Sequence, residues 1–262
     1  MTTSNPNNGR FVWYEHLAKD PKAAIAFYGD VIGWKTQPFT EGGGDYVMWV
    51  GSQGPLGGVM KLPDEATKMG TPPNWMAHVQ VENVDATASL AKKLGGKVYK
   101  EPEDIPTVGR FAVIADPQGA VISIFTPNAP MTLHDSSKAG EFCWNELLTS
   151  DSVAAVNFYS QLFGWKILQE MDMGPMGTYR VFGIGETQMG GMMTIPKGSP
   201  MPPTWLYYTE TSDLDAAIAR AKKNGAAIMN GPMDVPGGGR IAQLKDPQGA
   251  AFALHQAPKK AA

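Results

Sequence analysis

The sequence predicts an α+β fold in which two tandem domains are each built from βαβββ modules. The first observation is an internal repeat, because residues 11–35 match residues 142–166 at a constant offset of 131 with 12 identities in 25 positions. The second is that PPxW, Gly-Arg and DPQGA motifs recur in the same order in both halves. Repeats of this similarity share one hydrophobic pattern and one fold. They predict a domain at 11–127, a polar linker at 128–140 and a second domain at 141–256.

Each half of the chain divides again into two similar modules. Residues 11–17 are strand-like, and Asp20 is placed to cap a helix whose apolar residues recur at helical spacing as far as Gly33. From Trp75 the order returns, with a helix predicted to be capped by Asp85 and to stop at the Gly95-Gly96 pair. The short strands that follow the two helices are expected near 33–40, 45–51 and 57–62, and near 97–101, 110–116 and 120–126. The chain therefore holds four βαβββ modules.

The amino-acid composition argues against a nucleic-acid-binding protein, a membrane-spanning protein and a disulfide-rich protein. Lys plus Arg is 22 and Asp plus Glu is 25, so the net charge is −3, and no local run supplies the clustered positive charge that nucleic-acid binding needs. No apolar run approaches the roughly 18 residues of a membrane span. The single cysteine, Cys143, excludes an internal disulfide and any multi-cysteine metal site. We expect a cytoplasmic protein, a monomer or homodimer, whose partner is a small molecule rather than nucleic acid or membrane.

The motifs resemble those of a known superfamily. They are D-x-x-x-A-x-x-F-Y-x-x-x-x-G-W from Asp20, a helix that ends in Gly, and Gly-Arg followed by DPQG at Asp116. This pattern resembles the vicinal oxygen chelate superfamily, which includes glyoxalase I, extradiol dioxygenases and bleomycin resistance proteins. Within it the chain looks most similar to tandem glyoxalase-like proteins. The resemblance implies that paired modules form a curled eight-stranded sheet around a cavity, where the ligand binds.

The same resemblance bears on cofactors. Metal-dependent relatives place their ligands at three positions of each domain, and here those positions hold Trp13, Met76 and Ser123 in the first half and Trp144, Leu206 and Ala253 in the second. Divalent metals of this family need oxygen or imidazole ligands. No metal is therefore expected at the usual position, and no other cofactor. A displaced divalent site is the alternative, formed by Glu15, His78 and Ser123 in the first copy or by Glu146, Tyr208 and His255 in the second.

Strand alternation selects the candidate site residues. Trp13 and Glu15 share one face of their strand, as Trp144 and Glu146 do, and a buried carboxylate is either partnered or poised as a base. Glu15 and Glu146 are thus the candidate catalytic residues. The candidate ligand-binding residues are Trp13, His78, Arg110, Ser123, Trp144, Tyr208, Arg240 and His255.

Four further side chains either leave two interpretations open or are expected to lie outside the site. Arg110 and Arg240 either pair with the two glutamates or clamp a substrate carboxylate through the guanidinium fork. His16 lies on the strand face opposite Glu15, which predicts an exterior position. His134 lies in the linker and is expected to be solvated.

Three functions remain open. The first is a protein that binds a small organic molecule in its concave cavities, without the usual metal site, as the sequestering resistance proteins do. The second is a glyoxalase-like lyase or a dioxygenase- or hydroxylase-type enzyme on a small metabolite, with Glu15 or Glu146 as base or with a displaced metal. The third is a structural interaction protein with vestigial cavities. The missing metal ligands favour the first, and the duplicated glutamates keep the second open.

Overall fold

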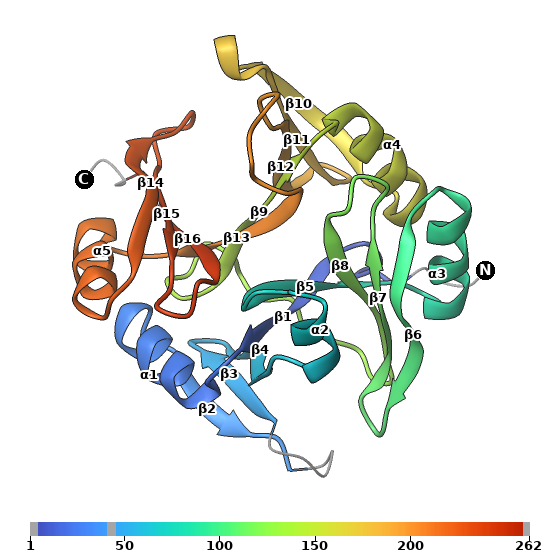
Figure 1. Cartoon of the computed structure of the whole chain (residues 1–262), viewed down its shortest axis with the longest axis horizontal. Helices are drawn as coiled ribbons and strands as arrows, with labels where there is room; N and C mark the ends of the chain where they lie inside the picture. Colours follow the sequence, from blue (N-terminus) through green and yellow to red (C-terminus); the bar gives the residue numbers. More distant parts are fainter. Residues whose placement is uncertain (1–4, 41–45, 259–262) are drawn as a thin grey trace. The chain divides into compact units, whose positions relative to one another are not determined.

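The computed structural model describes residues 5–40 and 46–258 and contains two eight-stranded sheets, one for each half of the sequence (Figure 1). The elements of the first half are β1 (Phe11–Ala18), α1 (Pro21–Val31), β2 (Lys35–Pro38), β3 (Val47–Gly51), β4 (Gly54–Lys61), α2 (Asp64–Lys68), β5 (Asn74–Gln80), α3 (Val84–Lys93), β6 (Lys97–Ile105), β7 (Gly109–Ala115) and β8 (Val121–Pro127). The predicted start of a strand at residue 45 lies outside the described residues. The rest of the βαβββ order is confirmed.

Within the described residues, the second half repeats this order without a counterpart of α2. Its elements are β9 (Phe142–Thr149), α4 (Ser152–Phe163), β10 (Lys166–Asp172), the 3₁₀ turn η1 (Gly174–Met176), β11 (Thr178–Ile184), β12 (Thr187–Thr194), β13 (Thr204–Glu210), α5 (Leu214–Lys223), β14 (Ala227–Asp234), β15 (Arg240–Lys245) and β16 (Ala251–Gln256). No helix in the described part of the chain is long and apolar enough to cross a membrane.

Strand order is the same in both sheets. It runs β2-β3-β4-β1-β5-β8-β7-β6 in the first and β10-β11-β12-β9-β13-β16-β15-β14 in the second. The outer strands of each module form antiparallel meanders, whereas β1 pairs with β4 and β5 with β8 in parallel. The fold is therefore α+β, with two tandem domains whose sheets are curled and not closed, as predicted.

The compact units of the structure do not follow the sequence repeat. The first unit takes residues up to Trp13, Met76–Leu133 and Trp144–Leu206, and the second takes Tyr14–Trp75, His134–Cys143 and the residues from Tyr207 onward. Each unit thus joins one module of the first half to one module of the second. Helices α3 and α4 contact each other in the first unit, and α1 and α5 do so in the second (Figure 1). The boundaries at 11–127, 128–140 and 141–256 remain a prediction for the domains.

The helix starts confirm one predicted cap and correct another. Asp20 accepts hydrogen bonds from the backbone N–H groups of Lys22 and Ala23, as its spacing predicted. The cap of α3 is Asn83 and not Asp85, because the Asn83 side chain accepts the Ala86 N–H. Asp85 lies in the first turn of the helix instead, where its carboxylate is available to another partner.

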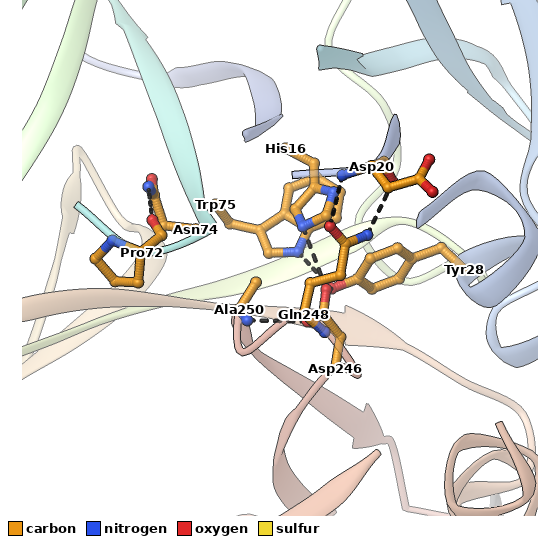
Figure 2. A network of polar contacts seen from close by, with 9 residues as sticks. All are labelled: His16, Asp20, Tyr28, Pro72, Asn74, Trp75, Asp246, Gln248 and Ala250. Carbon is orange, nitrogen blue, oxygen red and sulfur yellow. Dashed lines mark hydrogen bonds and ion pairs between the residues drawn. The ribbon is translucent and has the colours of Figure 1, made fainter. Parts of the chain in front are cut away.

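The core of the second unit contains a buried polar chain that the sequence did not predict. The Trp75 indole donates to the Tyr28 hydroxyl at 2.9 Å, and this hydroxyl donates to Asp246 Oδ2 at 3.1 Å. His16 Nε2 lies 3.3 Å from the same carboxylate oxygen, and its ring lies 4.7 Å from that of Trp75 (Figure 2). The predicted exterior position of His16 is wrong, since the residue is 0% exposed. The sheet face opposite Glu15 is covered by helix α1 and its aromatic residues, so both faces of β1 are buried there.

Candidate functional site

The buried carboxyl group of Glu15 is held by a tyrosine from the neighbouring hairpin. Glu15 lies in β1 and is 6% exposed, and Tyr46, directly before β3, donates its hydroxyl to Glu15 Oε2 at 2.9 Å. Burial raises the pKa of Glu15 to about 7, and the Tyr46 hydrogen bond opposes this shift. A carboxyl group with this pKa can both release and accept a proton near neutral pH.

The second half builds the same pair in the other unit. Tyr179, in β11, donates to Glu146 Oε1 at 3.0 Å, and the Trp144 indole donates to the Tyr179 hydroxyl at 2.8 Å. Burial and the adjacent Glu146 charge raise the pKa of Tyr179 well above its ordinary value, so the phenol keeps its proton. Trp144 and Glu146 are thus linked through the Tyr179 hydroxyl and not directly.

A glycine beneath each tyrosine makes the pair possible. Gly58 is the register partner of Glu15 in the parallel β1–β4 ladder, and Gly191 is that of Glu146 in β9–β12. A Cβ at Gly58 would lie 1.9 Å from the Tyr46 hydroxyl oxygen, and one at Gly191 would lie 2.1 Å from the Tyr179 ring. No side chain fits at either position while the tyrosine keeps its place.

The sequence contained a signal for these tyrosines. Tyr46 matches Tyr179 at an offset of 133, which is also the offset of Gly58 and Gly191. The predicted strand at 45–51 includes Tyr46, but the match between Tyr46 and Tyr179 was not recognised. Together the three matched positions define a motif, Glu in the first strand with Tyr and Gly in the hairpin, that occurs in both halves.

The remaining candidates of the first half belong to the first unit, whereas Glu15 belongs to the second. His78 in β5 and Ser123 in β8 are register partners. Burial lowers the pKa of His78 to about 4, so the ring is neutral at pH 7. Ser123 is fully buried and donates its hydroxyl to the Ala112 carbonyl oxygen at 3.1 Å. Trp13 is half-buried.

Two arginines have aspartate partners. Arg110 holds both carboxylate oxygens of Asp85, at 2.7 and 2.9 Å, and contacts Asp104 at 2.8 Å. Arg240 holds Asp215 in the same forked way, at 2.8 and 3.1 Å. The interpretation of these arginines as partners of Glu15 and Glu146 is therefore wrong. In each half the arginine of the Gly-Arg motif pairs with the aspartate in the first turn of its own module's helix, α3 or α5.

A surface cleft of about 610 Å³ adjoins Arg240. It is lined by Ser212, Asp213, Asp215, Ala216, Asp234, Gly238, Arg240, Gln256, Ala257 and Pro258. Three of these side chains are carboxylates and one is a cation that Asp215 already neutralises. A carboxylate ligand would have to compete with Asp215 for the guanidinium, so the cleft does not support the predicted clamp.

Tyr208 and His255 lie on neighbouring strands of the second unit. The Tyr208 hydroxyl accepts a hydrogen bond from Gln243 at 2.6 Å. His255 in β16 is the register partner of Glu210 in β13, and its Nδ1 lies 2.5 Å from Glu210 Oε2. Cys143 Sγ lies 3.4 Å from the Tyr208 carbonyl oxygen and joins Glu210 and His255 in one cluster. Sequence reasoning found His255 but missed Cys143 and Glu210.

The linker histidine also differs from its prediction. His134 was expected to be solvated, but its side chain is 19% exposed and its Nδ1 lies 2.7 Å from Glu141 Oε2. Glu141 itself is 1% exposed. The linker is thus anchored at this point, because a buried carboxylate requires a polar partner.

The positions that carry metal ligands in relatives do not fit a metal in this chain. Met76, Leu206 and Ala253 are buried and apolar, and the Ser123 hydroxyl is used by a backbone carbonyl. The indole of Trp144 offers an N–H donor that Tyr179 already accepts, and an indole has no lone pair for a metal. These residues supply no set of oxygen or nitrogen ligands.

Comparison with known proteins agrees with this architecture. The family model described as "Glyoxalase/Bleomycin resistance protein/Dioxygenase superfamily" matches residues 10–124 and 143–254. The protein named "Putative glyoxylase CFP32" of Mycobacterium tuberculosis (strain CDC 1551 / Oshkosh) is 33% identical over 251 residues, which are 95% of each chain. The anthracycline biosynthesis protein DnrV of Streptomyces peucetius is 28% identical over 258 residues, 94% of this chain and 92% of DnrV.

Solved structures show the same fold at low sequence identity. The Mn(II)-bound glyoxalase from Novosphingobium aromaticivorans superposes with a TM-score of 0.64 at 15% identity, covering 97% of this chain and 83% of that one. The 2,3-dioxygenase LapB from Pseudomonas sp. KL28 superposes with a TM-score of 0.66 at 10% identity, covering 98% and 94%. The repeat, the two curled sheets and the matches across both halves lead to one conclusion: the chain belongs to the glyoxalase/bleomycin resistance protein/dioxygenase superfamily.

Proposed function

We propose that the protein binds a small organic molecule at its two buried glutamate–tyrosine pairs, without a metal at the ligand positions of its relatives. The observation that supports this is the repeated Glu-Tyr-Gly motif, with Tyr46 on Glu15 and Tyr179 on Glu146. Burying a carboxyl group in each half is costly, and a purely structural role could be filled by an apolar pair at lower cost.

The chemistry of the pairs indicates what they recognise. A phenol and a carboxyl group together offer a donor and an acceptor, and half-buried Trp144 adds an aromatic surface beside one pair. A ligand with a hydroxyl or carbonyl group on a flat apolar frame fits these features. The anthracycline biosynthesis name of the relative DnrV supports hydroxylated polycyclic compounds as first probes.

A second function is favoured by one observation, the pKa of about 7 of Glu15. General bases work best when their pKa lies near the operating pH. In this alternative Glu15 takes a proton from a carbon or hydroxyl of the bound molecule and returns it elsewhere, while Tyr46 keeps the carboxyl group in place. Such a proton transfer suits a glyoxalase-like lyase.

Binding to hydroxylated anthraquinones, measured by thermal shift and then by calorimetry, tests the proposal. At a hundredfold excess over its dissociation constant, a ligand stabilises the protein by about 2.7 kcal/mol, which a thermal scan detects. We expect Glu15→Gln and Glu146→Gln to weaken binding at least tenfold, and Tyr46→Phe and Tyr179→Phe less, because the phenylalanine variants keep the carboxyl group. The variant Gln53→Ala, in the exposed β3–β4 turn, serves as the control and should leave binding unchanged.

Two outcomes decide between the functions. If a probe is consumed and its turnover follows a group of pKa near 7 that is lost in Glu15→Gln, the acid–base enzyme replaces the simple binding protein. If every probe that binds does so equally in all four variants, the glutamate–tyrosine pairs are structural and the proposal is wrong.

A further inference from the structure

Three ligand-type side chains meet on three adjacent strands of the second half. Cys143 lies in β9, Glu210 in β13 and His255 in β16, which are neighbours in the order β9-β13-β16. Their Sγ, carboxylate and imidazole atoms all lie within 4.8 Å of one another. The side chain of Glu210 is 8% exposed and that of His255 is 25% exposed, so the cluster lies at the margin of the core, where an ion can reach it.

The surroundings orient each of these groups toward the others. The Ala257 N–H donates to Glu210 Oε1 at 2.9 Å, which leaves Oε2 directed at His255. Gly239 packs against the far side of the imidazole, where a Cβ would lie only 2.6 Å from His255 Nε2. The ring is therefore held with Nδ1, and not Nε2, facing Glu210.

We propose that Cys143, Glu210 and His255 form a divalent metal site of the zinc class. Thiolate, imidazole and carboxylate are the three ligand types that zinc takes from proteins, at about 2.0–2.3 Å. Tetrahedral ligands at such distances lie about 3.3–3.5 Å apart, so the present cluster needs only small side-chain adjustments. On binding, the metal–sulfur bond forms as the Cys143 S–H bond breaks and its proton passes to water, and the His255 proton resides on Nε2.

This site differs from the positions that serve metal-dependent relatives, which here are Trp144, Leu206 and Ala253. With three protein ligands it leaves a fourth position open, which is typical of metals that meet water or substrate. The inference is independent of the proposed glutamate–tyrosine function, because the cluster contains neither Glu15 nor Glu146.

The first half supplies an internal control. The positions matching Cys143, Glu210 and His255 at offsets of 131, 130 and 130 hold Val12, Gln80 and Phe125. None of these is a good ligand for zinc. The backbone around them is that of the same fold, and even the glycine beneath the ring is kept, since a Cβ at Gly109 would lie 2.7 Å from the Phe125 ring. We therefore expect one metal ion per chain and not two.

Titration of the metal-free, full-length protein with Co²⁺ tests this site. We expect one equivalent to bind, with a thiolate-to-cobalt charge-transfer band in the near ultraviolet and the visible bands of a tetrahedral ion, and Zn²⁺ to displace it. The variants Cys143→Val, Glu210→Gln and His255→Phe each place the first-half residue in a backbone position of the same kind, so we expect them to fold. Cys143→Val should abolish the charge-transfer band, and the other two should weaken cobalt binding at least tenfold.

The control is His78→Tyr, which places the second-half residue in the first half and removes a histidine outside the cluster. It should leave the cobalt spectrum and affinity unchanged. Cobalt binding that persists with its charge-transfer band in Cys143→Val, or wild-type protein that binds no cobalt at millimolar concentration, would overturn the proposal. Circular dichroism of each metal-free variant separates lost binding from lost folding, and Cys143→Ser provides a second test if Cys143→Val unfolds.

Discussion

The two DPQG turns carry buried aspartates whose side-chain partners are the same except for one. In each unit an indole donates to a tyrosine hydroxyl that donates to the aspartate: Trp75, Tyr28 and Asp246 in one, and Trp205, Tyr159 and Asp116 in the other. His16 adds its imidazole to Asp246, whereas the matching residue at an offset of 131 is Leu147.

This one difference reverses the direction of the pKa shift. Burial raises the pKa of Asp116, and its hydrogen bonds only partly oppose this. Burial also favours a higher pKa at Asp246, but the hydrogen bond and charge of His16, with backbone N–H groups, lower it overall. The comparison shows that duplicated geometry does not imply duplicated charge, because one neighbouring side chain decides which protonation state the fold stabilises.

The largest loss of unfolding free energy is expected from His16→Leu, which makes the surroundings of Asp246 resemble those of Asp116. Removing one partner of a buried ion pair costs roughly 3 to 5 kcal/mol. A lowered aspartate pKa contributes stability above the unfolded-state pKa of about 4, and this contribution is lost as pH falls through the folded-state value. The difference in unfolding free energy between wild type and variant, from urea titrations between pH 3 and 6, should therefore shrink toward low pH.

The reciprocal variant, Leu147→His, sharpens this comparison. It should lower the pKa of Asp116. The unfolding free energy should then fall less as pH rises, because ionising Asp116 in the folded state costs less. If His16→Leu were as stable as wild type throughout the range, the ion pair would contribute nothing and the two aspartate sites would be equivalent.

A second large effect concerns Glu15. Its pKa is raised to about 7, so the folded state favours the protonated carboxyl group, and a penalty of about 3 kcal/mol develops as pH rises from about 4 to 7. Glu15→Gln has no such titration. The variant should gain stability relative to wild type across this window, as measured by thermal unfolding at pH 5 and pH 8, and an equal difference at both values would contradict the raised pKa.

Removing the hydroxyl of Tyr159 or of Tyr28 should lower the unfolding free energy by intermediate amounts, and the two losses should differ. Tyr159→Phe takes a donor from Asp116 and an acceptor from the Trp205 indole, and we expect a loss of about 2 to 3 kcal/mol. Tyr28→Phe removes the matching bonds, but Asp246 keeps its His16 partner, so a loss of about 1 to 2 kcal/mol is expected. Urea unfolding at pH 7 measures both, and the reverse ranking would show that His16 does not compensate.

The smallest changes in stability are expected when Arg110 or Arg240 is replaced. Their ion pairs with Asp85 and Asp215 are exposed, and exposed pairs contribute little because water and salt screen them. Arg110→Ala and Arg240→Ala should leave the urea midpoint unchanged within error. A clear loss of ligand binding in either variant would revive the substrate-clamp interpretation.

The sequence by itself determined the repeat, the four βαβββ modules, the family and the face that carries Glu15 and Glu146. These follow from local patterns: strand alternation, the Asp20 cap and the turn motifs all act within a few residues. The positions that lack metal ligands were also readable, because each lies at a fixed distance from such a motif.

Only the tertiary structure decided which side chains meet. His16 reaches Asp246 across 230 positions, and Cys143, Glu210 and His255 come together from three strands. Tyr46 was placed on Glu15 by the β1–β4 register and by the space above Gly58. Contacts of this kind depend on strand order and register, and these are set by the packing of whole sheets and helices rather than by any local pattern.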